Sequence, residues 1–209
     1  MITGNTRIRT TPAGCARDIC VASLMGLAGA SQALAHVRQG QTQGLLTGLA
    51  HPLSGLDHML AMIAVGLWGA QLGSPALWLL PVTFPLVMSI GGFLAQVGVH
   101  VPGVEIGVAL SALLLGLMVA FEAKPDLPLA AALVAVFAIF HGHAHGTELP
   151  PEQSGLTYSI GFVISTGCLH LAGITMGLAY KWRAGQLAIR LIGAAVAVGG
   201  AIFLAGVDT

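Results

Sequence analysis

Long apolar stretches, separated by short breaks rich in glycine and proline, dominate the chain after its first 35 residues. The breaks contain turn-forming pairs such as Ser74-Pro75, Pro102-Gly103 and Lys124-Pro125. A helix needs about 20 mostly apolar residues to cross a lipid bilayer. The pattern therefore predicts six membrane-spanning helices, over Leu45–Ala70, Leu77–Val97, Val104–Phe121, Leu129–Phe140, Leu156–Tyr180 and Leu187–Gly206.

Two of these segments depart from a plain apolar run. Pro52 disfavours helical geometry at His51 and suits the first position of a helix, so a break is expected there, with Gly44–Ala50 as a separate short element. The fourth segment is short in apolar residues. It crosses a bilayer only if the helix continues through a group of histidines to about Gly146.

The first 35 residues resemble a targeting segment. Three arginines, Arg7, Arg9 and Arg17, precede the apolar run Ile19–Ala30, and Ala33-Leu34-Ala35 fits the small-x-small cleavage rule. An uncleaved first helix is the alternative, although the apolar run is short for a crossing. We therefore predict an all-α protein with a signal peptide at residues 1–35 and a six-helix transmembrane domain at residues 36–209.

Composition supports a membrane protein, because 56% of the residues are hydrophobic and only 8% are charged, against about 25% charged in ordinary soluble domains. The net charge is zero, so a nucleic-acid partner has no electrostatic support and the lipid bilayer is the expected surrounding. Lys124, Lys181 and Arg183 fall after the third and fifth segments, which places those loops in the cytoplasm. The expected location is the bacterial inner membrane, with the mature N-terminus in the periplasm.

The motif HPLSGLDH brings His51, Asp57 and His58 to the start of the first apolar segment. His51 and His58 are seven residues apart, so on a regular helix with about 100° per residue they share a face. Ionisable side chains are costly in a membrane unless they meet a partner or a cavity. Imidazole and carboxylate are ligands of divalent transition metals, so we interpret the motif as a metal site. The alternative is a capping histidine beside a structural aspartate.

The motif FHGHAHGTELP ends the fourth segment. His141 and His145 are four residues apart, and Glu148 returns to the same face, whereas His143 points away on a regular helix. No glutamate follows His141, so the HExxH pattern of zinc proteases is absent. We include all four residues among the candidate ligands. The alternative is a histidine-rich loop end that binds metal weakly.

Two further ionisable residues are weaker candidates. Glu105 begins the third segment, where a carboxylate also complements the helix dipole. His170 is a lone histidine on an apolar face, and a satisfied core histidine is its alternative interpretation. With the predicted orientation the motif residues gather in the outer half of the bundle, where an uptake protein first captures its ion.

These motifs, HPLSGLDH followed by MLAMIAVGLWG, then VPGVEIGVALS and FHGHAHGTELP, resemble those of the HupE/UreJ family. The resemblance implies a small bacterial inner-membrane permease for nickel or cobalt, associated with hydrogenase and urease maturation. The family's motif residues correspond here to His51, Asp57 and His58, and to His141, His145 and Glu148.

The sequence thus predicts secondary uptake of a divalent metal ion, with Ni²⁺ first and Co²⁺ second, and no prosthetic group. His51, His58, His141 and His145 would hold the partly dehydrated ion, and Asp57 and Glu105 would compensate charge. No P-loop motif is present, so ATP hydrolysis through one is not expected. Three alternatives stay open: a cobalt permease linked to cobalamin synthesis, a metal-binding sensor that does not translocate, and an intramembrane hydrolase with Ser54 as nucleophile or a histidine-bound metal as Lewis acid. So do the energy source and a homo-oligomeric state.

Overall fold

The computed structural model describes residues 42–149 and 154–207, so the predicted signal peptide lies outside the described residues. All regular secondary structure in those two ranges is helical. This confirms the all-α prediction for that part of the chain. The long helices are α2 (Leu56–Leu72), α3 (Ala76–Gln96), α4 (Val104–Ala120), α5 (Leu127–Thr147), α6 (Gly155–Gly177) and α7 (Arg183–Gly206), with short 3₁₀ turns η1 (His51–Leu53) and η2 (Leu178–Lys181).

Not every helix is long and apolar enough to cross a membrane on its own. Four spans, namely α3, α5, α6 with η2, and α7, are long and apolar enough to cross a bilayer. Helix α4 has 17 residues and is shorter. Residues 42–53 and α2 form a pair bent by 78°, which fits either a broken span or a re-entrant loop. Length and composition thus support four crossings, or up to five with the bent pair, and six crossings stay a prediction.

The break expected at Pro52 is present. The helical residues 42–50 end in the 3₁₀ turn η1, which contains Pro52, and Gly55 is extended before α2 begins at Leu56. The segment predicted over Leu45–Ala70 is therefore two helices with the expected break between them, where proline and glycine interrupt the helical backbone. Helix α5 also runs on through the histidines to Thr147, as its predicted extension required.

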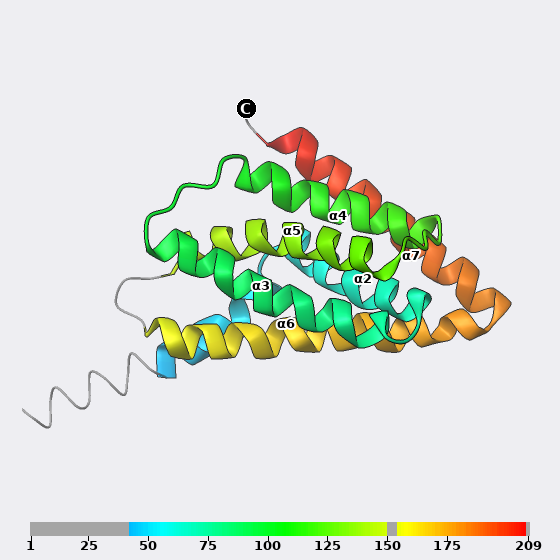
Figure 1. Cartoon of the computed structure of the whole chain (residues 1–209), viewed down its shortest axis with the longest axis horizontal. Coiled ribbons are helices and arrows are strands. Elements are labelled where there is room, and N and C mark those ends of the chain that lie inside the picture. The colour runs from blue at the N-terminus through cyan, green and yellow to red at the C-terminus, as the bar shows by residue number, and fades with distance from the viewer. Residues whose placement is uncertain (1–41, 150–153, 208–209) are drawn as a thin grey trace, which may run out of the picture.

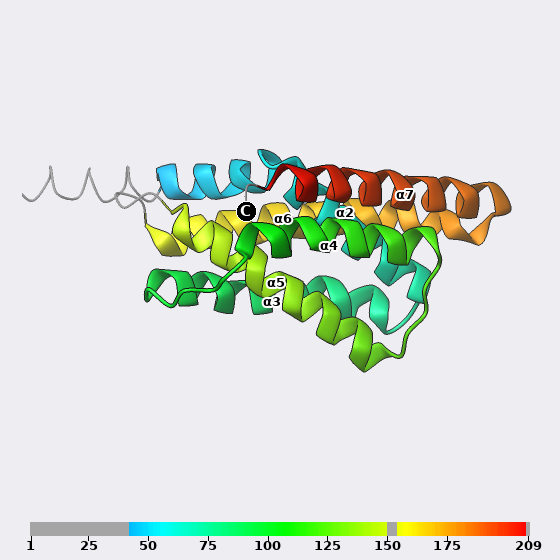
Figure 2. The ribbon, with the colours of Figure 1, turned by 90° about the horizontal axis from the view of Figure 1, so that it is seen from above.

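The helices pack mainly as three pairs, α3 with α5, α4 with α7, and α2 with α6 (Figures 1 and 2). Each pair has glycine at its closest approach. A Cβ atom on Gly142 of α5 would meet the Met88 carbonyl oxygen of α3, and one on Gly66 of α2 would meet the His170 carbonyl oxygen of α6. A Cβ atom on Gly193 of α7 would lie 2.6 Å from the backbone nitrogen of Ala120 in α4. Small residues at these crossings let the backbones touch, as in other membrane bundles.

One end of the bundle collects the histidine motifs. Helices alternate in direction, so the starts of α2, α4 and α6 share an end with the last residues of α3 and α5 (Figure 1). Lys124, Lys181 and Arg183 lie at the opposite end, in the α4–α5 connection, in η2 and at the first residue of α7. This separation of basic residues from the histidines agrees with the predicted orientation.

Candidate metal centre

Three imidazole rings from two helices converge inside the bundle. His58 lies in the first turn of α2, and His141 and His145 lie one turn apart near the end of α5. His58 Nδ1 is 2.8 Å from His141 Nδ1 and 3.0 Å from His145 Nε2. His141 and His145 are buried, and His58 is partly buried. We call these three residues the inner trio.

The spacing of the inner trio suits a shared divalent cation. At a metal–nitrogen distance of about 2.1 Å, two ligands at a right angle are about 3.0 Å apart. The two nitrogen–nitrogen separations of 2.8 and 3.0 Å are close to this value. Imidazole is a good ligand for Ni²⁺, Co²⁺ and Zn²⁺ alike. The geometry therefore favours a transition metal as a class without choosing one.

Ser111 of α4 sets the protonation of His141. The serine Oγ donates to the Val108 carbonyl oxygen at 2.6 Å and lies 2.7 Å from His141 Nε2. Because the serine proton is committed to the carbonyl, His141 Nε2 donates to the serine oxygen. His141 Nδ1 then carries the free lone pair and faces His58. Such a hydrogen bond to the outer nitrogen of a histidine is the usual support of a metal ligand.

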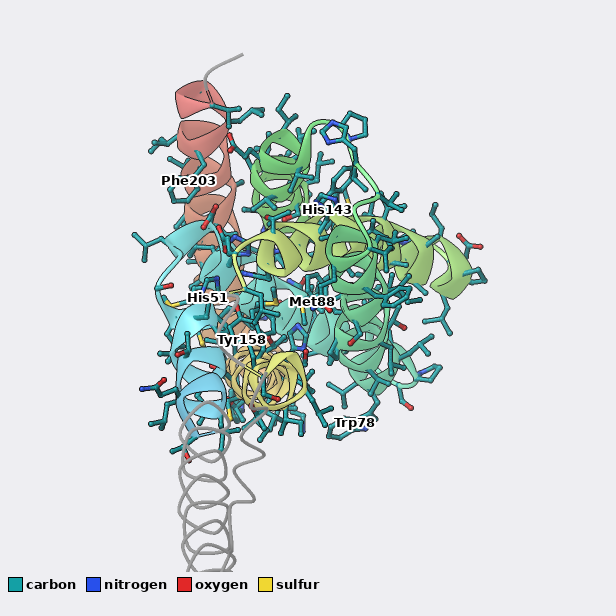
Figure 3. All side chains as sticks on the ribbon, turned by 90° about the vertical axis from the view of Figure 1, so that its left-hand side faces the viewer. His51, Trp78, Met88, His143, Tyr158 and Phe203 are labelled. Carbon is teal, nitrogen blue, oxygen red and sulfur yellow. The ribbon has the colours of Figure 1, made fainter. Side chains whose placement is uncertain are left out.

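A second group, the outer group, shares His145 with the inner trio. It consists of His51, His145 and Glu148, whose ligand atoms lie within 4.8 Å of one another. His51 Nε2 donates to Glu148 Oε2 at 2.8 Å, whereas His145 Nδ1 is 3.5 Å from the same oxygen. Figure 3 shows His51 beside Tyr158 between the helices at this end of the molecule, while Trp78 points outward. His145 therefore faces the inner trio with Nε2 and the outer group with Nδ1.

Glu148 follows the last residue of α5 and is exposed. Interaction with His145, and then with His51, lowers the pKa of this carboxyl from 4.5 to about 2, although partial burial acts in the opposite direction. A carboxyl with this pKa is ionised throughout the physiological range. Glu148 thus gives the outer group a permanent negative charge.

Three carboxylates line a cavity that reaches the inner trio. Asp57, Glu105 and Glu148 border it together with His58, and its volume is about 260 Å³. Asp57 Oδ1 also accepts the backbone N–H of His58 at 2.9 Å, so this carboxylate supports the start of α2 as well. Asp57 and Glu105 belong to neither ligand group among the described residues. Their position suits attraction of a cation rather than direct ligation.

The other candidates lie elsewhere. His143 points away from the trio, as expected on a regular helix, and its Nε2 donates to the Val99 carbonyl oxygen at 2.8 Å. His170 is buried on α6 and is separate from both ligand groups. The phenyl ring of Phe84 contacts the rings of both His141 and His170. Sequence reasoning missed Ser111 and Phe84. A serine in an apolar segment is only a weak indication of a functional role, and a phenylalanine in such a segment is no indication of one.

Comparison with known proteins agrees with the motifs. The family described as HupE / UreJ protein matches residues 23–203. Protein HupE from Rhizobium leguminosarum bv. viciae is 46% identical over 174 residues, which are 83% of this chain and 91% of that protein. No solved structure matches the chain. On the extent of the first match and the identity of the second, the chain belongs to the HupE / UreJ protein family.

Proposed function

We propose that this protein carries a divalent transition-metal ion, nickel before cobalt, across the bacterial inner membrane to supply hydrogenase or urease maturation. The observation that carries the proposal is the convergence of three histidine nitrogens from α2 and α5 within an apolar helical bundle. Buried ionisable groups in membrane segments are characteristic of ion pathways. Membership of the HupE / UreJ family supports the same function.

The ion would first meet the carboxylate-lined cavity. Asp57, Glu105 and Glu148 supply three carboxyl groups around it, which attract a divalent cation and raise its local concentration. Glu148 and His51 are the most accessible of the candidate ligands that lie close together. They offer one carboxylate oxygen and one imidazole nitrogen to an ion that still keeps most of its water.

His145 would then pass the ion from the outer group to the inner trio. A neutral imidazole has one protonated nitrogen and one lone pair. With the proton on Nε2, the His145 ring presents its Nδ1 lone pair to the outer group. With the proton on Nδ1, the ring faces Glu148 and presents Nε2 to the inner trio. A shift of this one proton changes which group can hold the ion.

The alternatives have less support. In the hydrolase alternative Ser54 is the nucleophile, but its hydroxyl donates to the His51 carbonyl oxygen at 2.6 Å rather than to a basic nitrogen. A nucleophilic serine needs a base within hydrogen-bond reach. The same ligand set would serve a sensor that binds metal without translocation. A cobalt permease would use the same residues, since imidazole sites bind Ni²⁺ only somewhat more tightly than Co²⁺.

Uptake of radioactive nickel into proteoliposomes that contain the full-length protein tests the proposal. We expect saturable uptake, inhibited by excess Co²⁺ and lost in His58→Ala. His100→Ala is the matched control, because His100 is an exposed loop histidine outside both groups. Binding of nickel without uptake would favour the sensor. If the protein neither binds nickel nor takes it up, the metal assignment is overturned.

A further inference from the structure

Three polar side chains on α6 are buried without a hydrogen-bond partner: Tyr158, near the start of the helix, and Thr166 and His170 deeper in it. Thr166 is 0% exposed and His170 is 1% exposed. Neither Thr166 Oγ1 nor either ring nitrogen of His170 has a partner. The two residues are four positions apart, so they share one face of the helix. Both lie in the part of the chain that we propose to be membrane-spanning.

Unpaired polar groups in such surroundings are unfavourable and need a reason. A buried hydroxyl or imidazole loses its hydrogen bonds to water, and packing alone would be served better by valine or leucine. Ionisable residues retained inside membrane bundles commonly line ion pathways. The arrangement therefore indicates a ligand that is absent from the isolated chain.

A backbone carbonyl of α3, that of Pro81, also faces His170. Helix α3 contains Pro81 and Pro85. Proline has no N–H, so Pro85 leaves the Pro81 carbonyl without its usual helical donor. This carbonyl interacts with the His170 imidazole, although the contact falls short of hydrogen-bond geometry. Carbonyl groups freed from helical bonding coordinate cations in transporters with interrupted helices.

Aromatic rings separate Thr166 and His170 from the inner trio. The Phe84 ring centroid is 5.3 Å from that of His141 and 5.5 Å from that of His170, edge-to-face in both cases. The Phe162 ring centroid lies 4.3 Å from that of His145, one helical turn before Thr166. Both phenylalanines are buried. Thr166 and His170 are thus adjacent to the inner trio but lie beyond its aromatic lining.

We propose that His170, Thr166 and the Pro81 carbonyl form a second cation site, which a divalent transition-metal ion occupies after it leaves the inner trio. This inference rests on the proposed function. The second site offers one imidazole nitrogen and two neutral oxygens, a weaker set than three imidazoles. Weak binding suits a position from which the ion must leave, because conduction fails at a site that holds its ion too tightly.

Equilibrium binding of radioactive nickel to the purified full-length protein tests the second site. We expect two classes of binding in the wild type. His170→Leu should lose the weaker class and keep the tighter one. Thr166→Val should weaken only the weaker class, by about tenfold, as loss of one supporting ligand does. Thr175→Val is the control, since Thr175 is exposed on the same helix and bonds to the Ala172 carbonyl oxygen.

Uptake into proteoliposomes gives the second readout. His170→Leu and Thr166→Val should each reduce nickel uptake by about tenfold while the tighter binding class is unchanged. Wild-type binding and uptake in Thr166→Val, which removes only an unpaired hydroxyl, would overturn the second site even if His170→Leu fails to fold. The tighter class should disappear in His145→Ala while the weaker one persists. If the wild-type protein lacks the tighter class of nickel binding, the proposed function is contradicted instead. Failure of the second site and failure of the proposed function are therefore distinguishable.

Discussion

Ser111 Oγ accepts a hydrogen bond from His141 Nε2–H at 2.7 Å and donates one to the Val108 carbonyl oxygen at 2.6 Å. The bond joins α4 to α5 inside the bundle and leaves His141 Nδ1 as the basic nitrogen. Without it, His141 is free to take the other tautomer, in which a proton occupies the position that a metal ion needs. A residue that touches no ion therefore prepares one of the ligands.

Ser111→Ala should lower the apparent affinity for nickel uptake by about tenfold, because the support of a metal-ligating histidine contributes that much. The measurement is the concentration dependence of nickel uptake into proteoliposomes at equal protein content. Thr175→Ala is the matched control, since it removes a hydroxyl that bonds only within its own exposed turn. Equal affinity in Ser111→Ala and the wild type would show that the His141 tautomer does not limit binding.

His58→Ala and His145→Ala should each abolish most uptake. Their nitrogens are 3.0 Å apart, so they act as one unit. The double variant should be scarcely worse than either single variant, because residues in one network are not additive. His51→Ala should cause a smaller loss, since His51 belongs only to the outer group. Glu122→Gln is the control, because Glu122 lies near Arg190 at the opposite end of the bundle.

Partial losses that multiply in the double variant would contradict a shared site. They would mean that α2 and α5 each bind metal through their own motif. Protein abundance in the membrane must be measured for every variant. A loss of uptake without a loss of protein separates ligands from residues that are needed for folding.

Local chemistry explains which parts of the fold were predictable. The break after residue 50 follows from the geometry that Pro52 imposes on its neighbour, whatever the rest of the chain does. The continuation of α5 to Thr147 follows from its apolar length and the absence of proline between Pro128 and Pro150. The number of crossings was less predictable, because the 17 residues of α4 and the 78° bend leave two segments ambiguous.

The site depended more on packing. Spacing along α5 places His141 and His145 on one face, and the sequence motifs indicated all the members of both ligand groups. Spacing cannot show that His145 serves two groups with its two nitrogens, since that depends on how α2 approaches α5. For the same reason Ser111 was missed, because its role comes only from a contact between helices.

Nickel uptake should weaken as the external pH falls, because a histidine binds a metal ion only in its unprotonated form. Glu148 does not cause this loss. Its pKa is lowered to about 2, so it stays ionised above that pH and keeps its charge across the whole decline. Glu148→Gln should therefore reduce uptake over the whole pH range, because the carboxylate that attracts the cation is lost at every pH. Uptake that rises steadily from pH 7 to about 5 would indicate proton-coupled symport or ligands other than histidine.

Reporter fusions test the orientation. Fusions after Lys124 and Arg183 should report cytoplasm, and a fusion at residues 150–153 should report periplasm, because the basic residues lie opposite the histidine end. A fusion after Val99, between α3 and α4, gives an independent periplasmic position. The reverse pattern would place the carboxylate-lined cavity on the cytoplasmic side and make an export direction the better proposal.

Gly142→Ala should disturb the metal centre without removing any ligand. A Cβ atom there would collide with the Met88 carbonyl oxygen, and α3 and α5 can relieve the collision only by moving apart. Gly142 lies between His141 and His143, so the movement displaces the nitrogen of His141 from that of His58. Overpacking of this kind costs about 1–3 kcal/mol. We expect a lower midpoint of thermal unfolding in detergent and a large loss of nickel uptake.

Gly167→Ala is the control, because a Cβ at Gly167 meets nothing within 4 Å and alanine favours a helix over glycine by about 1 kcal/mol. That variant should be as stable as the wild type or more so, with normal uptake. Normal stability and uptake in Gly142→Ala would mean that α3 and α5 are not in direct backbone contact at the histidines.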